Sequence, residues 1–177
     1  MSVLMKNILR FIFFILVQVF VLDKVPLLHQ YLKPTVAFLF ILWLPFSLSR
    51  VALMAIAFVF GLVLDYFSGV PGLHSAPMVL IAYLRPFLLN LLLPQQKAEI
   101  TYSDPSTKSI GIGPYTIYVL VLTVVYHLYL TFIEWMQFGD FLFFIGKVLA
   151  TSVLSLALIF ITELLFFRKV KFKTNAG

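Results

Sequence analysis

Cysteine is absent from this 177-residue chain, and charged residues make up only 11% of it. Without cysteine there is no disulfide, no thiolate metal ligand and no cysteine nucleophile. The shortage of charge is more informative, because soluble domains carry about a quarter charged residues. Aspartate and glutamate are the scarcest charges, seven against thirteen lysines and arginines. The polar surface is therefore too small for a globule that faces water.

Catalytic signatures are also missing. The chain has no G-x-S-x-G, no H-E-x-x-H and no phosphate-binding glycine loop. Its acids and histidines do not cluster at a catalytic or metal-ligand spacing. The aromatic residues lie in apolar blocks instead of along a basic stripe, so nucleic-acid binding is not expected. We predict a non-enzymatic protein with no catalytic residue, cofactor or metal.

What the chain does have is apolar length, with 62% hydrophobic residues and a mean hydropathy of +1.06. In lipid every backbone polar group must be satisfied within helices or a closed barrel, and the blocks lack the alternation of barrel strands. One helical crossing needs about 20 apolar residues. The sequence predicts an all-α polytopic membrane protein, a single domain with about six transmembrane helices. The expected spans are 7–22, 35–48, 51–65, 76–93, 115–133 and 141–167.

The second and third spans come from one apolar tract that ends at Asp65. As a single helix it would be about 45 Å long, too long for one crossing. Pro45 and Arg50 mark the break, because proline disfavours helix at the residue before it and Arg50 is the only cation of the tract. Both spans are short for the hydrocarbon core, so either their flanks reach the interface or one is partly re-entrant.

The cations sort unevenly onto the two sides of this six-span arrangement. Cytoplasmic loops of membrane proteins carry the excess of lysine and arginine. One side holds Lys24 and Lys33 and most of the acids. The other holds the loop 94–113 and the tail 168–177, with the cations Lys6, Arg10, Arg50, Lys97, Lys108, Arg168, Lys169, Lys171 and Lys173. We expect this second side, with both termini, to be cytoplasmic.

Arg85 is the most costly polar residue within a predicted span, since arginine at the bilayer centre costs about 2.5 to 3.5 kcal/mol on insertion scales. Pro86 follows it, so the helix could kink and free a carbonyl for the guanidinium. Two interpretations of Arg85 remain. It is either a structural arginine of this kind, or an arginine that contacts a lipid phosphate or an acidic side chain of a partner. Asp65 is the nearest acid along the sequence.

The segment from Gly61 to His74 holds the densest local signals. Gly61 and Asp65 lie one helical turn apart, which lets another backbone approach at Gly61. Gly72 and the glycine and proline before it predict a compact turn. One interpretation is a helix end, a cap and a turn; the other is a partner-docking surface whose loop Asp65 anchors.

These residues resemble the MreD family, the rod shape-determining membrane proteins of bacteria. The likeness is carried by Gly61-Leu62-Val63-Leu64-Asp65, Gly72-Leu73-His74 and Ala82-Tyr83-Leu84-Arg85-Pro86, with the size, the multi-span layout and the basic C-terminal end. The resemblance implies a membrane scaffold subunit of the cell-elongation machinery, which makes peptidoglycan, in the inner membrane. It also implies a fold similar to the substrate-binding subunits of energy-coupling-factor vitamin transporters.

The partners that the resemblance implies are the membrane helix of MreC and, indirectly, the MreB filament, the RodA glycosyltransferase and a class B penicillin-binding protein. The lipid bilayer is the medium. Gly61, Asp65, Gly72, His74, Arg85 and Pro86 would form the partner-binding or structural motif. The alternative is a vitamin-like small-molecule binding subunit of a transporter, in which Asp65, His74 and Arg85 line a pocket.

Overall fold

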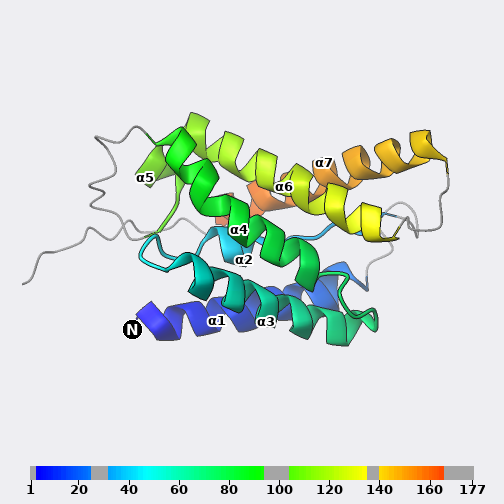
Figure 1. Ribbon diagram of the computed structural model, residues 1–177, viewed down its shortest axis with the longest axis horizontal. Coiled ribbons are helices and arrows are strands. Elements are labelled where there is room, and N and C mark those ends of the chain that lie inside the picture. Colours follow the sequence, from blue (N-terminus) through cyan, green and yellow to red (C-terminus); the bar gives the residue numbers. More distant parts are fainter. Residues whose placement is uncertain (1–2, 25–31, 94–103, 135–139, 166–177) are drawn as a thin grey trace, which may run out of the picture.

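A computed structural model describes residues 3–24, 32–93, 104–134 and 140–165, and these residues form helices without a strand (Figure 1). The helices differ widely in length. They are α1 (Val3–Leu16), η1 (Val17–Leu22), α2 (Leu39–Leu42), α3 (Arg50–Ser68), α4 (Ser75–Leu92), α5 (Thr107–Ile110), α6 (Ile112–Glu134) and α7 (Phe141–Leu165).

Five of these helical stretches are long and apolar enough to cross a bilayer: Leu4–Leu22, which joins α1 to η1, and α3, α4, α6 and α7. Each has 18 to 24 residues, as a hydrocarbon core of about 30 Å requires. Their outward faces carry large apolar side chains such as Phe87 and Leu142. The chain is therefore an all-helical polytopic membrane protein.

The long helices form two layers. In Figure 1, α1 and α3 lie together on one side and α6 and α7 on the other, while α4 packs against both α3 and α6. The start of α3 is set by Ser49, whose hydroxyl accepts the Ala52 N–H at 3.2 Å. Its end is set by Gly69, which has a φ of 71° and donates its N–H to the carbonyl of Asp65.

The segment expected as the span 35–48 is a correction to the predicted fold. Its only helix is α2, four residues long, and the chain on either side is extended or turned. All residues from Pro34 to Pro45 are buried, and we call this stretch the central segment. Figure 1 shows it passing through the middle of the molecule, between the two layers, back to the end at which α1 begins.

Length and proline explain why the central segment is not a continuous helix. Its twelve residues would reach only about 18 Å as an α-helix, but about 40 Å if extended. Pro45 stands at its end and disfavours helix at the residue before it, Leu44. A chain that must traverse the bundle in so few residues is therefore largely non-helical.

The other boundaries lie close to the ranges expected from the sequence. The predicted loop 94–113 is shorter than expected at its end, because α5 begins at Thr107 and α6 at Ile112. Residues 94–103, the end of the last predicted span and the tail 168–177 lie outside the described residues.

The bundle has two chemically different ends. The "Lys108 end" comprises the starts of α1, α3 and α6 together with α5, and the "Asp65 end" comprises the end of α3 and the start of α4 (Figure 1). In Figure 1, the chain returns to the Lys108 end after each pair of passes. This arrangement positions the polar clusters described next.

Candidate functional site

Asp65 organises the turn between α3 and α4, which we call the Asp65 turn (residues 65–75). Its buried carboxylate accepts three backbone N–H groups, from Gly72 at 2.9 Å, His74 at 2.6 Å and Ser75 at 3.2 Å. Gly72 has a φ of 87°, a left-handed conformation that glycine adopts without strain. Because Ser75 begins α4, the carboxylate also caps a helix N-terminus. Asp65 therefore anchors the loop.

Two further contacts fix the Asp65 turn against its surroundings. A Cβ on Gly61 would lie 2.8 Å from the backbone nitrogen of Ser75, so the start of α4 sits directly on α3 at this position. On the other side, Nδ1 of His74 lies 3.0 Å from the hydroxyl of Tyr126 in α6. Burial lowers the pKa of His74, and the nearby Asp65 carboxylate opposes that shift. Burial, and not the tyrosine contact, is thus what favours the neutral imidazole.

Gln18 provides hydrogen-bond partners for the backbone in the first part of the central segment. Its Oε1 accepts the N–H groups of Val36 at 3.0 Å and Ala37 at 3.3 Å, while its Nε2 donates to the carbonyl of Pro34 at 3.2 Å. Gln18 lies in η1, where the wider π-helical turn is closed by the Asp23 N–H donating to the Gln18 carbonyl. One buried amide side chain replaces the hydrogen bonds that a helix would have made.

Arg85 and Tyr118 donate hydrogen bonds to backbone carbonyls in the last part of the central segment. The guanidinium Nη2 donates to the Leu44 carbonyl, and Nε donates to the Tyr118 hydroxyl at 3.0 Å. Tyr118 in turn donates to the carbonyl of Leu42 at 3.1 Å. Arg85 is only 3% exposed, so it is buried in the bundle and faces no headgroup. The sequence suggests a carbonyl of its own helix, freed by a kink at Pro86. The carbonyl that Arg85 reaches belongs instead to the central segment.

The first part of the central segment is also held by α7, which α6 supports from behind. The Thr35 N–H donates to Oγ of Ser155 at 3.0 Å, and Ser155 lies 3.0 Å from Nε2 of His127. Since Nδ1 of His127 contacts the carbonyl of Thr123 at 2.9 Å and a carbonyl only accepts, Nδ1 carries the proton and Nε2 accepts from Ser155. His127 is therefore a satisfied interhelical residue.

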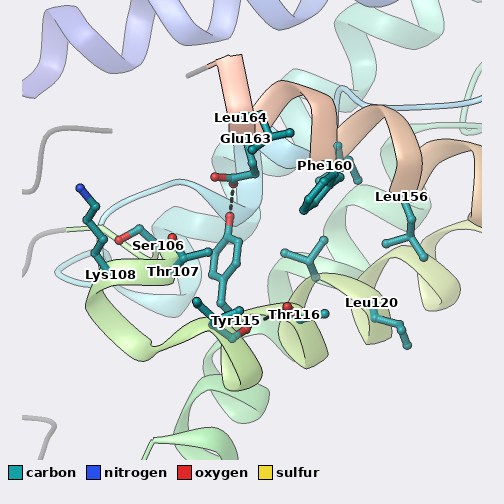
Figure 2. A pocket seen from close by; sticks show the side chains of 13 residues that line it. Ser106, Thr107, Lys108, Tyr115, Thr116, Leu120, Leu156, Phe160, Glu163 and Leu164 are labelled. Atoms are coloured by element: carbon teal, nitrogen blue, oxygen red, sulfur yellow. Dashed lines mark hydrogen bonds between the residues drawn. The ribbon is translucent and has the colours of Figure 1, made fainter. Parts of the chain in front are cut away.

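Trp43 links the central segment to the Lys108 end. Its Nε1 donates to Oε1 of Glu163 in α7 at 2.8 Å and lies 3.1 Å from the Tyr115 hydroxyl. Tyr115 also donates to Oε1 of Glu163 (Figure 2).

The six residues of the predicted motif thus separate into two groups. Gly61, Asp65, Gly72 and His74 meet at the Asp65 turn, whereas Arg85 and Pro86 lie in α4, where Arg85 contacts the central segment. Asp65 and Arg85, both described, are not joined by an ion pair.

Sequence reasoning passed over Gln18, Tyr118 and Ser155. Gln18 had a usable signal, because it is an amide within the apolar run of the first span. Tyr118 and Ser155 had none, since hydroxyl residues are ordinary in membrane helices and their partners lie far away in sequence.

A pocket of about 410 Å³ opens between α5, α6 and α7. Figure 2 shows Lys108 at one end of it, Leu120 and Leu156 at the other, and Tyr115 and Glu163 between them. None of the six motif residues lines this pocket. Among the residues that the structure describes, no cluster of three His, Asp or Glu side chains is placed to hold a metal ion.

Comparison with known protein families, with curated proteins and with solved structures finds no match.

Proposed function

We propose that this chain is a non-enzymatic scaffold subunit of a bacterial cell-elongation complex, of the MreD type. It would sit in the inner membrane with both termini in the cytoplasm, bind the membrane helix of MreC, and through it act with MreB, RodA and a class B penicillin-binding protein. The proposal rests on the motif residues from Gly61 to Pro86 and on how the structure uses them.

One observation supports a scaffold over an enzyme: the buried side chains of Asp65, Gln18 and Arg85 are engaged with the chain's own backbone. Asp65 accepts three N–H groups, Gln18 serves three backbone groups and Arg85 donates to Leu44. Groups used in this way hold a shape and are not presented to a substrate. A rigid bundle with an apolar outer surface suits a protein that positions other membrane helices.

The first test is depletion of the protein in its host, with microscopy and affinity capture of MreC. We expect cells to become round, and the tagged chain to retain MreC from detergent extracts. Asp65→Ala should lower MreC capture at an unchanged membrane level, whereas Asp140→Ala, an exposed carboxylate, should not. If Asp65→Ala leaves both capture and rod shape intact, the turn has no role in docking.

Orientation is tested separately. A C-terminal alkaline phosphatase fusion should be inactive, because that enzyme folds only outside the cytoplasm, and a fusion after Lys24 should be active. Activity of the C-terminal fusion would place the basic tail outside and reverse the proposed topology.

The alternative, a small-molecule binding subunit of a transporter, is favoured by one feature, the pocket at the Lys108 end. The residues first named for it, Asp65, His74 and Arg85, are engaged elsewhere. A carrier should copurify with an ATPase module, and its loss should create a nutrient requirement in cells that stay rod-shaped. Rounded cells without such a requirement would decide for the scaffold.

A further inference from the structure

The pocket at the Lys108 end has the layout of a site for an amphiphile. Its far part is lined by hydrocarbon side chains, among them Leu120, Leu156 and Phe160. Leu120 and Phe160 are 45% and 66% exposed, so this part opens onto the outer surface of α6 and α7. In a membrane-spanning bundle that surface faces acyl chains. The volume of about 410 Å³ lies within the range of about 300 to 1,000 Å³ typical of ligand pockets.

The near part of the pocket is polar and carries a cation. Lys108 is exposed at the end opposite Leu156, beside Ser106 and Thr107 (Figure 2). The carboxylate in the pocket, Glu163, lies between the two parts and accepts from Tyr115 and Trp43. The positive charge therefore lies at one end of the pocket and the negative charge lies between the two ends, beside Tyr115 of α6.

The charges around this end are complementary to an anionic headgroup. Lys6 and Arg10 at the start of α1 lie 4.0 and 3.4 Å from Asp104, and Arg50 begins α3 at the same end. Anionic lipids attract basic residues near a membrane surface by about 1 kcal/mol for each. A free phosphate would use Lys108 but leave the apolar part empty, whereas a phospholipid fills both parts.

We infer that the pocket binds one anionic phospholipid, with an acyl chain along Leu120, Leu156 and Phe160 and the phosphate at Lys108. Glu163 keeps the phosphate on the Lys108 side, because its carboxylate and the phosphate are both negative and repel each other. The inference requires only that the chain spans a membrane, so it stands or falls independently of the proposed partners.

Native mass spectrometry of the full detergent-purified chain tests the site. The probes are phosphatidylglycerol and phosphatidylcholine with identical acyl chains. We expect one phosphatidylglycerol to be retained in preference to phosphatidylcholine. Lys108→Gln should weaken phosphatidylglycerol binding about fivefold and phosphatidylcholine binding less, because the choline of the latter already balances its phosphate charge. Arg50→Gln, an exposed cation of the same end that does not line the pocket, should have a smaller effect.

A matched pair of tryptophan substitutions separates the pocket from the general lipid surface. Leu120→Trp narrows the pocket and should abolish the retained lipid. Leu128→Trp, on the same helix with 47% exposure and outside the lining, should leave it in place. Equal retention by the two variants, or equal binding of the two lipids by the unaltered chain, would overturn the inference.

Photo-crosslinking in intact membranes identifies the occupant independently. A benzophenone amino acid at Phe160 should yield a mass increase of one phospholipid, whereas one at Val153, 65% exposed on the same helix but outside the lining, should give a mixture of lipids. A protein-sized adduct specific to position 160 would show that a partner helix fills the pocket and would refute the lipid assignment.

Discussion

The Asp65 turn and the central segment both contain backbone groups that need hydrogen-bond partners from side chains, but their surroundings differ. In each, one side chain satisfies three backbone groups of a non-helical stretch: Asp65 at the turn and Gln18 in the segment. Asp65 reaches residues at most ten positions away, and the turn is partly open at Gly72 and His74. Gln18 reaches residues up to 19 positions away that are fully buried.

The difference between the turn and the central segment shows where the loss of a hydrogen bond is most costly. At the turn, water can reach the half-exposed Gly72 and His74 when their partner is lost. In the central segment it cannot, and non-helical backbone at membrane depth is tolerated only where protein satisfies it. The segment consequently draws on four elements, through Gln18 of η1, Arg85 of α4, Tyr118 of α6 and Ser155 of α7.

The largest effect is expected for Gln18→Leu. The change leaves two buried N–H groups and one carbonyl without a partner, at about 1 to 3 kcal/mol each, so we expect a loss of about 4 kcal/mol of folding free energy. Unfolding in mixed micelles by a denaturing detergent measures it. Leu16→Ala, an exposed position just before η1, serves as the control and should cost under about 1 kcal/mol. Similar losses from the two variants would refute the role of Gln18.

The second-largest effect is expected for Arg85→Met, with a loss of about 3 kcal/mol of folding free energy. The Leu44 carbonyl and the Tyr118 hydroxyl lose their donor, while the side-chain volume is roughly kept. Arg85→Lys should recover only part of this, since an ammonium cannot reproduce the two directed bonds of the guanidinium. The same unfolding assay applies, with the exposed Arg50→Met as the control. Full rescue by lysine would mean that charge alone matters there.

Asp65→Leu tests the comparison directly, because it removes the same number of backbone contacts as Gln18→Leu. We expect only about 2 kcal/mol, since water reaches the turn at Gly72 and His74. Hydrogen exchange should show the released N–H groups of residues 72–75 exchanging faster, while the central segment stays protected. A loss as large as that of Gln18→Leu would remove the distinction between the two regions.

Gly61→Ala should cost about 1 to 2 kcal/mol. The new methyl group meets the backbone of Ser75, which cannot move aside without shifting the start of α4. Gly146→Ala is the matched control, because nothing lies within 4 Å of a Cβ there, and alanine should stabilise helix α7 slightly. Thermal melting in detergent compares the pair; equal melting temperatures would contradict the close approach at Gly61.

The smallest effect concerns His74 and pH. Burial lowers its pKa in the folded state, so the unfolded chain binds the proton more readily. Stability is therefore greatest above the ordinary histidine pKa of about 6.5 and declines as the pH falls below it. His74→Gln should flatten this decline between about pH 7 and pH 5 in melting experiments. An unchanged pH profile in the variant would assign the decline to other groups.

Membrane class, helical structure and the limits of the long helices followed from the sequence, because apolar length and local turn chemistry are written in neighbouring residues. The Asp65 turn belongs to this local category: a carboxylate, two glycines and a helix start stand within one short stretch. The sequence also indicated that the span 35–48 is short and that the apolar tract breaks at Pro45.

Only the tertiary structure decided how the central segment runs and what Arg85 does. An extended apolar segment cannot be told from a short buried helix by composition, because both are uniformly hydrophobic. Its hydrogen-bond partners come from side chains as far as 120 residues away, and no local pattern encodes such pairs. The sequence determined that polar groups at membrane depth needed partners; the packing of four elements around one segment determined which partners they have.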